Sequence, residues 1–324
     1  MPGPDHPTAA EAPELPSLTP VSTMEPVDLV ATDGGEPVTS RRARQGRLGV
    51  LGALAVSWLA LVVLLAVFAP VLPLDDPDDN IASIVGQGPG TDGHLLGGDS
   101  LGRDLLSRMV WGGRASLLLG VSSVLLGLVV GGLLGLLAGY FRGRADTVLS
   151  GAFDVLLSFP QLILALTLVT VFASGEGISA TRRMVVLILA LGVVSIPVLA
   201  RITRANTMAW SQREFVMAAR AMGAKNRQIM FGEVLPNVLP AMFSIALLGV
   251  AVVIVAEGGL SLLGVGVQLP TPSWGNILSE GRSELRDSPH IVLIPTVVIF
   301  LTVLALNYLG DIVRARFDVR ESAL

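Results

Sequence analysis

Long stretches without charged side chains alternate with short polar segments along most of the chain. Six of these stretches approach or exceed the roughly 20 residues that a helix needs to cross the hydrocarbon core of a membrane. They cover 48–74, 115–141, 147–175, 184–200, 234–256 and 288–310. The only acidic or basic side chains in them are Asp154 in the third and His290 in the last. Their apolar residues run continuously instead of alternating, which favours helices over transmembrane strands. The pattern predicts an all-α membrane protein with six transmembrane helices.

Composition narrows the function classes. Hydrophobic residues make up 52% of the 324 and charged residues only 15%, whereas a soluble domain has about 25% charged residues. A soluble enzyme is therefore excluded, no nucleophile–base pair stands out, and no nucleic-acid partner is expected. The chain has no cysteine, which excludes disulfides and thiolate metal sites. His6, His94 and His290 lie far apart in the sequence, so no metal site is predicted.

Residues 1–47 differ from everything that follows. The first forty contain no Lys or Arg, and they combine acidic residues with Pro, Gly, Ser and Thr. This composition is typical of a disordered tail, which is either a solvated extension or a regulatory or docking element. The basic cluster RRARQGR closes the tail, directly before the membrane domain predicted for residues 48–313.

The basic residues predict the orientation. If the N-terminus is cytoplasmic, most of the 22 Lys and Arg residues fall in cytoplasmic segments, as expected from the bias of such segments towards positive charge. Both termini, including a C-terminal tail at 314–324, are then cytoplasmic. The segment 203–236 lies on the same side, and the segments 75–114 and 264–287 lie outside.

The two outside segments are structured in different ways. The segment 75–114 begins with four aspartates and ends with Leu101, Leu105 and Met109 at helical spacing, which predicts a short helix along the outer interface. The segment 264–287 is apolar but broken by glycines and prolines. Irregular backbone at membrane depth needs protein or a water-filled cavity around it, so this segment is either a re-entrant loop or an ordinary packed loop.

The cytoplasmic segment 203–236 contains the pattern of a short amphipathic helix. Ser211 and Glu214 have the S-x-x-E spacing of a capping box. An apolar face then follows at helical spacing, formed by Phe215, Ala218, Ala219 and Met222. Gly223 is placed to end the helix in the left-handed conformation. Pro236 and Pro240 open the next membrane helix, where a missing N–H is tolerated.

Three interpretations of this short helix remain open. Its basic residues would suit lipid headgroups, or it could be an internal packing element. The small side chains of Ala218 and Ala219, beside Gly223, favour a third interpretation, because a lipid-seeking helix prefers Leu, Trp and Phe. Small residues let another backbone approach closely, so the helix is predicted to enter a socket on a partner protein.

At this point the sequence resembles a known family. Ala218, Ala219 and Gly223, followed by Leu235 and Pro236, resemble the EAA loop of ATP-binding-cassette (ABC) importer permeases. The form AARAMGA with LPN is similar to the dipeptide, oligopeptide and nickel branch, and four further segments resemble its C-type subunit over roughly residues 49–320. These are LGGDSLGRDLLSRMVWGGRASL, GYFRGRADTVLSGAFDVLLSFP, AEGGLSLLGVGVQLPTPSWGNILSEGR and LGDIVRARFDVR. Met217 stands where the motif usually has glutamate, and Glu233 where it usually has an apolar residue or histidine.

The resemblance implies the type I ABC importer permease fold, in the plasma (inner) membrane. The implied partners are a homologous permease subunit forming a heterodimer, two cytoplasmic ATPase subunits, an extracytoplasmic solute-binding protein and membrane lipid. The residues implied to couple this chain to the ATPase are Glu214, Ala218, Ala219, Gly223, Leu235, Pro236 and Asn237. Those implied to meet the binding protein are Asp99, Gly102, Arg103, Asp104 and Trp274.

The chain lacks the chemistry for ATP hydrolysis. No phosphate-cradling G-x-x-x-x-G-K-[ST] motif occurs, since the one lysine lies in MGAKNR. The chain is therefore expected to be non-catalytic and to bind no cofactor, with ATP and Mg²⁺ on partner subunits. Short peptides are the expected cargo, with nickel or another small solute as the alternative. An ion-coupled carrier and a membrane scaffold without transport remain as further alternatives.

Charged side chains within membrane helices are functional candidates by default. Asp154, the helix-breaking Pro160 and Glu257, which precedes the glycine pair GGL, are candidates for the translocation path or its gate. The alternative for both carboxylates is a hydrogen bond between helices, worth about 1 kcal/mol.

Overall fold

A computed structural model of the chain describes residues 49–173 and 178–321. The predicted acidic tail lies outside the described residues, as do the last three residues. Within the described part, five helices are long and apolar enough to cross a membrane, and a bent pair makes a sixth span if it counts as one. The five are α1 (Val50–Phe68), α2 (Leu105–Phe141), α5 (Ala180–Trp210), α8 (Leu235–Leu262) and α10 (His290–Glu321); the bent pair is α3 (Gly143–Ser158) and α4 (Gln161–Phe172). The prediction of an all-α membrane protein is confirmed.

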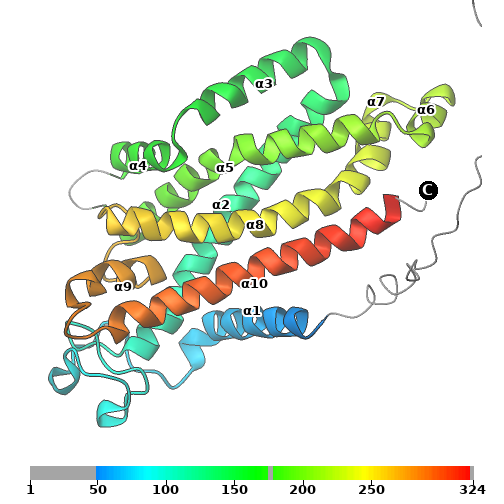
Figure 1. The fold of residues 1–324 in the computed structure, drawn as a ribbon. Coiled ribbons are helices and arrows are strands. Elements are labelled where there is room, and N and C mark those ends of the chain that lie inside the picture. The colour runs from blue at the N-terminus through cyan, green and yellow to red at the C-terminus, as the bar shows by residue number, and fades with distance from the viewer. Residues whose placement is uncertain (1–48, 174–177, 322–324) are drawn as a thin grey trace, which may run out of the picture. The chain divides into compact units, whose positions relative to one another are not determined.

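Shorter elements connect these helices at the two ends of the bundle. At one end lie η3 (Ala69–Val71), η4 (Ala82–Ile84), η5 (Thr91–Gly93), α9 (Trp274–Gly281) and η7 (Arg282–Glu284); at the other lie α6 (Glu214–Ala221), α7 (Asn226–Gln228) and the π-helix η6 (Ile229–Val234). Figure 1 shows α9 and α6 at opposite ends of the bundle. The only strand-like pairing among the described residues is a single bridge between Gly98 and Asp104.

Helix α2 packs most extensively along α5 and also contacts α8 and α1. A row of glycines spaced four residues apart allows its backbone to approach α5 closely. A Cβ atom at Gly131 would lie 2.5 Å from the carbonyl oxygen of Ile196, and one at Gly135 would lie 2.3 Å from that of Ala200. Small residues at a helix contact are a common device in membranes, where burial of apolar surface does not drive helices together.

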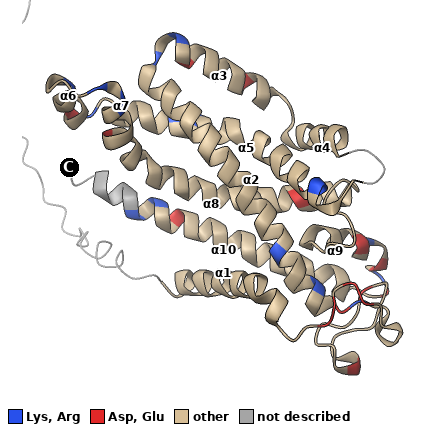
Figure 2. Cartoon of the chain, turned by 180° about the vertical axis from the view of Figure 1, so that it is seen from behind, with Lys and Arg blue, Asp and Glu red and all other residues tan. Residues whose placement is uncertain are grey.

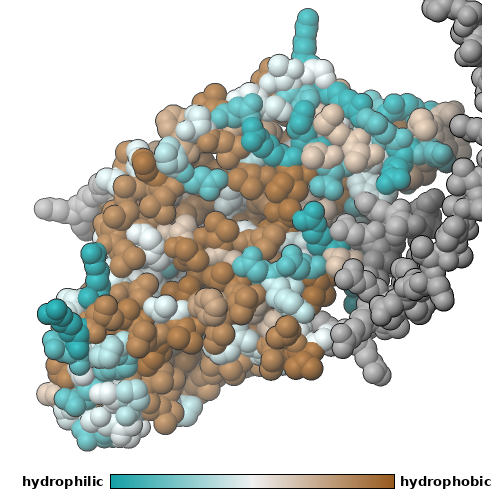
Figure 3. Space-filling view, in the orientation of Figure 1, coloured by the Kyte–Doolittle hydropathy of each residue, from teal (hydrophilic) through white to brown (hydrophobic). Residues whose placement is uncertain are grey.

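The surface of residues 49–321 fits a lipid environment. Large apolar side chains such as Leu64, Leu125 and Phe300 are about half exposed on the helices. Figure 3 shows apolar residues covering the middle of the visible face, and Figure 2 shows that most charged residues gather near the two ends. These exposed apolar side chains, which are unfavourable in water, therefore lie where the acyl chains of lipids can cover them.

The start of α2 corrects one prediction. Leu105 and Met109, expected in a separate interfacial helix, belong to the first turns of α2 and are buried at 0% and 6% exposure. Asp104 begins the helix by accepting a hydrogen bond from the backbone N–H of Ser107 at 2.7 Å. The polar residues of these first turns are buried within the protein. They interrupt the apolar run of the sequence, but they do not interrupt the helix.

The third predicted span is two helices instead of one. Helices α3 and α4 meet at a bend of 86°. Pro160 has no N–H to continue the hydrogen-bond ladder, and Phe159 before it adopts an extended conformation with ψ of 136°. The sequence identified Pro160 as a helix break. The bend there is large enough to divide the predicted third span into two separate helices.

Three helices extend beyond their apolar stretches. Helix α5 continues to Trp210, α8 to Leu262 and α10 to Glu321. The predicted cytoplasmic segment 203–236 therefore begins inside α5, and the predicted C-terminal tail begins inside α10. Apolarity marks where lipid can cover a helix, whereas backbone hydrogen bonding continues into water.

Candidate functional site

The α5–α8 connection (residues 211–234) contains the predicted short helix as α6. Its end is as expected: Gly223 has a φ of +84°, and its N–H bonds to the carbonyl of Arg220 at 3.0 Å. Its start is different. Ser211 ends α5 and donates its hydroxyl to the carbonyl of Met208, so it does not cap α6, and the predicted capping box is wrong. Arg213 precedes α6 instead, and Glu214 lies in the first turn, where a negative charge suits the helix dipole.

The two sides of α6 are used differently from the prediction. Val216 is fully buried, and Ala219 is half-buried against the core. The other three residues of the predicted apolar face point outward. We call them the α6 stripe: Phe215, Ala218 and Met222. Met222 is 82% exposed. The helix is therefore anchored through Val216, and a second apolar surface, the α6 stripe, remains uncovered by the rest of the described chain.

Hydrogen bonds join the α5–α8 connection to the neighbouring membrane helices. The hydroxyl of Tyr140, at the end of α2, donates to the side-chain oxygen of Asn226 at 3.1 Å. Arg142, which joins α2 to α3 with a φ of +51°, donates to the carbonyl of Met208 in α5 at 3.3 Å. Arg213 lies over the ring of Trp210 at 5.2 Å. The connection is thus attached to α2 through Asn226 and to α5 through Arg213.

The predicted coupling residues after α6 lie on a continuous helical path. Ile229 and Val234 are buried in η6, and the N–H of Leu235 bonds to the carbonyl of Met230, five residues back. Pro236 follows in the first turn of α8, as predicted. Asn237 is exposed and donates to the carbonyl of Glu233, also exposed, at 2.7 Å. A turn at residues 222–225 separates α6 from α7, and α7, η6 and α8 then follow one another without a break.

The candidate path residue Asp154 has a partner that sequence reasoning missed. It forms an ion pair with Arg201, and both side chains are about half exposed. Eight residues earlier on α3, Asp146 pairs with Arg204, with 2.7 Å between Oδ2 and Nη2. Pro160 begins α4 at the bend. The spacing of the two arginines on α5 was visible, but their pairing depends on the antiparallel packing of α3 against α5. A role of Asp154 in the translocation path stays a prediction.

The second candidate, Glu257, is buried at 1% exposure. Its Oε1 accepts hydrogen bonds from Ser261 at 2.8 Å and from Ser273 at 2.9 Å. A Cβ atom at Gly275 would lie 2.7 Å from Oε2, so only glycine lets α9 approach this carboxylate. Glu257 thereby joins α8 to α9. The predicted alternative of a hydrogen bond between helices describes this geometry, and a gating role stays a prediction.

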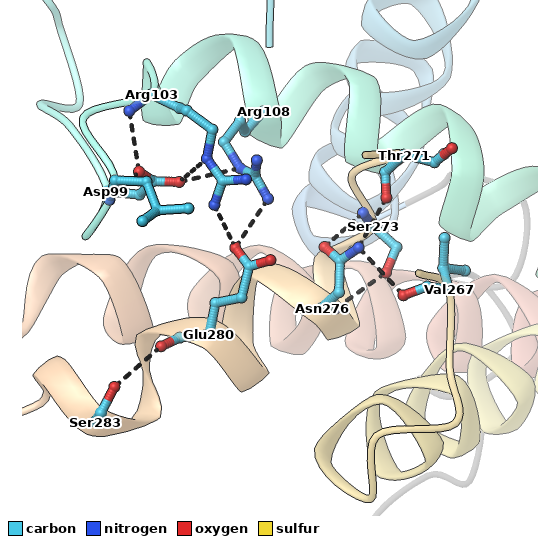
Figure 4. A network of polar contacts seen from close by, with 10 residues as sticks. Asp99, Arg103, Arg108, Val267, Thr271, Ser273, Asn276, Glu280 and Ser283 are labelled. Carbon is cyan, nitrogen blue, oxygen red and sulfur yellow. Dashed lines mark hydrogen bonds and ion pairs between the residues drawn. The ribbon is translucent and has the colours of Figure 1, made fainter. Parts of the chain in front are cut away.

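The segment 264–287 is therefore a packed structure. Trp274, at the start of α9, is buried and donates its indole N–H to the carbonyl of Met109 at 3.0 Å. Its backbone N–H bonds to the hydroxyl of Ser116 at 3.1 Å. Figure 4 shows Asn276 reaching back to the carbonyls of Val267 and Thr271. Helix α9 contacts α2, α8 and α10, which gives the irregular backbone the protein surroundings that it needs.

A buried ion-pair network also links α9 to the start of α2 (Figure 4). We call it the arginine network: Asp99, Arg103, Arg108 and Glu280. Arg103 lies 2.7 Å from Asp99 and 2.6 Å from Glu280, and Arg108 lies 3.0 Å from the same oxygen of Glu280. Arg108 has no exposed surface. Two cations and two anions together limit the cost of burying charge.

The arginine network changes how the predicted binding-protein contacts are understood. Asp99, Gly102, Arg103, Asp104 and Trp274 are all buried in the structure. Their polar side chains bond within the chain, so they hold this end together and do not themselves present a contact surface. Docking of a binding protein at this end stays a prediction, and it would use the exposed residues around them.

Counting histidines alone missed one further cluster. His94 lies beside two aspartates, and Asp75, His94 and Asp104 form a group that could hold a metal ion. We call it the His94 cluster. The prediction of no metal site overlooked it because Asp75 is 19 positions before His94, and loop folding brings them together. A histidine followed ten residues later by an N-capping aspartate was the only signal in the sequence.

Comparison with known proteins agrees with this arrangement. Residues 131–322 match the family of binding-protein-dependent transport system inner membrane components. The chain is 40% identical over 234 residues to a glutathione transport system permease protein, GsiD, of Pectobacterium atrosepticum, covering 72% of this chain and 75% of the relative. It is 41% identical over 224 residues to a di/tripeptide transport system permease protein, DppC, of Pseudomonas aeruginosa, covering 69% and 71%.

Solved structures show a similar fold. The described helices match a chain of the MetNI methionine ABC transporter, from a structure of its inward-facing conformations, with a TM-score of 0.52 and 22% identity. The match covers 65% of this chain and 97% of that chain. The family match and the sequence relatives show that the chain belongs to the family of binding-protein-dependent transport system inner membrane components.

Proposed function

We propose that this chain is the transmembrane permease subunit of an ATP-driven importer that delivers short peptides to the cytoplasm by alternating access. The observation that carries the proposal is the identity of about 40% to permeases named for glutathione and for di- and tripeptides. Glutathione is itself a tripeptide, so the named substrates share one chemical class. Nickel or another small solute is the alternative cargo.

The α5–α8 connection supports energy input from a separate ATPase. Its α6 stripe offers an apolar surface that water disfavours, while Val216 and Tyr140 tie the same segment to the bundle. A partner that grips α6 can therefore displace α2 and α8. ATP and Mg²⁺ are then bound by two partner ATPase subunits, and a homologous permease completes the membrane pair.

The orientation in this proposal puts α6 and both termini in the cytoplasm. Arg142, Arg213, Arg220 and Arg227 all lie at or near the α6 end, as positively charged residues do on the cytoplasmic side. The α9 end then faces the binding protein. Its exposed residues include the acidic segment after α1 and the apolar side chains of Leu95 and Leu101.

Reconstitution tests the function and names the cargo. The chain is purified with its accompanying subunits, and ATP hydrolysis is measured with the cognate binding protein, either empty or loaded with dipeptides, tripeptides, longer peptides or nickel. We expect stimulation by short peptides. Stimulation by nickel alone would show that the cargo is nickel and not peptides. The lack of any accompanying ATPase would refute ATP-driven import.

A single substitution tests the coupling role of α6. Gly223 has a left-handed conformation, yet nothing lies within 4 Å of an added Cβ atom, so Gly223→Val disturbs the backbone and not the packing. We expect membrane insertion to persist and import to be lost. Gly151→Ala is the control, because this helical glycine also has open space and has an ordinary φ. Import by Gly223→Val at the wild-type rate would contradict the coupling role.

A further inference from the structure

The His94 cluster brings three side chains from separate parts of the chain to one point. Asp75 follows η3, His94 follows η5, and Asp104 precedes α2. The Nδ1 atom of His94 lies 3.0 Å from Oδ1 of Asp104 and 3.5 Å from Oδ2 of Asp75. All three ligand atoms lie within 4.8 Å of one another. The cluster lies at the α9 end and has no part in the function proposed above.

Neighbouring groups hold the side chain of Asp104 and the backbone of Asp75 and His94 in place, and Ser107 bonds to both aspartates. Asp104 uses its other oxygen, Oδ2, to cap α2 through the backbone N–H of Ser107. The hydroxyl of Ser107 donates to the backbone carbonyl of Asp75 at 2.5 Å. The carbonyl of His94 accepts from the N–H of Gly90 at 2.9 Å. Outer contacts of this kind fix ligands before an ion arrives.

The two carboxylates of the cluster attract a cation. Two carboxylates converge on the same nitrogen, and a single N–H can donate well to only one of them. Like charges held this close repel each other. Two carboxylates carry a charge of −2, which a divalent cation balances.

The distances and ligand types indicate which cation fits. Zn²⁺ binds nitrogen and oxygen ligands at about 2.0–2.2 Å, so two of its ligands in tetrahedral geometry lie about 3.4 Å apart. The separations of 3.0 and 3.5 Å are close to this value. Imidazole favours transition metals over Ca²⁺ and Mg²⁺. The side chain of Asp75 is 57% exposed, which leaves an open side for entry and for a bound water.

We propose that Asp75, His94 and Asp104 form a binding site for a divalent transition-metal cation, with Zn²⁺ as the best match. The bound ion fastens residues 75–94 to the first turn of α2. It thereby stiffens the loop that lies beside the arginine network. The role is structural and requires no change of oxidation state.

The test is a metal titration of the full chain with its accompanying subunits in lipid nanodiscs. The affinity tag carries no histidine, and the sample is first treated with a chelator. Calorimetry with Zn²⁺ is expected to show one site per chain. Asp75→Ala and His94→Ala are each expected to weaken binding at least about 100-fold, since even outer partners of a metal ligand contribute 10- to 100-fold. Ca²⁺ is expected to bind more weakly than Zn²⁺.

Two matched variants separate this site from adventitious binding. Asp79→Asn removes an exposed aspartate of the same loop, and His290→Gln removes a second histidine at the same end. Both are expected to bind Zn²⁺ like the wild type. Asp75→Ala removes a largely exposed side chain, so it is the variant least prone to misfolding, and thermal unfolding without metal checks its fold. Zn²⁺ is then expected to raise the Tm of the wild type and not that of Asp75→Ala.

The outcomes decide the proposal. Zn²⁺ binding that survives in both Asp75→Ala and His94→Ala, or no saturable binding to the wild type, would refute it. In the second case the cluster is an ordinary histidine–aspartate pair. X-ray absorption of the Zn²⁺ complex is expected to show nitrogen and oxygen ligands, with the imidazole contribution lost in His94→Ala.

Discussion

The two ends of the bundle differ in which side chains they expose and which they bury. At the α6 end, Met222 is largely exposed, and Phe215 is partly exposed beside the ring of Trp210. At the α9 end, Arg108, Glu257 and Trp274 point inward and are almost completely buried. The α6 end leaves apolar side chains exposed, whereas the α9 end pairs its polar side chains with one another.

The comparison also explains why charge is distributed as it is. The α9 end contains a buried network of two arginines and two carboxylates, where removal of one member leaves the others uncompensated. The one basic residue of α6, Arg220, and Arg213 before it are exposed and can be screened by water and salt. Substitutions are therefore expected to act on stability at one end and on transport at the other.

The largest effect is expected from Arg108→Met. Removing one partner of a buried ion pair typically costs about 3–5 kcal/mol, because the opposite charge remains buried. Glu280 would keep only Arg103. The free energy of unfolding in detergent micelles measures the loss. Arg286→Met, at an exposed arginine near the same end, is the control and is expected to change it by less than about 0.5 kcal/mol. A loss below 1 kcal/mol for Arg108→Met would mean that charge does not hold the α9 end together.

A smaller effect is expected from Gly275→Ala. The added methyl group would lie 2.7 Å from Oε2 of Glu257, and overpacking of this kind costs about 1–3 kcal/mol. Unfolding in micelles again measures the change. Gly151 lies in the middle of α3 with open space around an added Cβ atom. Gly151→Ala is therefore expected to leave the free energy of unfolding unchanged or to raise it by up to about 1 kcal/mol. If both substitutions had the same effect, close packing of α9 against Glu257 would not be important.

The smallest effect on stability is expected from Met222→Gln in the α6 stripe. Because the side chain is 82% exposed, its replacement should change the free energy of unfolding by less than about 0.5 kcal/mol. Peptide import and peptide-stimulated ATP hydrolysis should nevertheless fall, since an apolar contact with the ATPase is lost. Met217→Gln, also exposed on α6 but off the stripe, is the control for transport. Equal transport by both variants and the wild type would show that the stripe is not a docking surface.

Sequence reasoning succeeded where a property belongs to the local chain. Uncharged runs predicted the membrane helices, and Gly223 predicted the end of α6, because each depends on a few neighbouring residues. It failed where the local sequence fitted two structures equally well. Ser211 and Glu214 have the spacing of a capping box, but α5 continues through residue 210 and uses Ser211 for its own end.

The same limit applies to the candidate site. The sequence identified Asp154 and Glu257 as unusual charges, but not Arg201 as the partner of one or Ser273 as the partner of the other. The residues predicted to meet a binding protein are instead buried by packing and bond within the chain. Whether a polar residue faces water or another residue depends on which helix lies opposite.

The sequence by itself therefore determined that this protein is a helical membrane component, roughly where its spans lie, and where a short helix, α6, interrupts them. Hydropathy, glycine conformation and short motifs depend on local chemistry, so they can be seen in one dimension. Only the tertiary structure decided that α3 and α4 meet at 86°, that Arg108 closes a network with Glu280, and that His94 lies between two aspartates. The last two depend on residues distant in the chain, which are brought together only by the packing of whole helices and loops, and the size of the bend, unlike its place at Pro160, is not visible in the sequence.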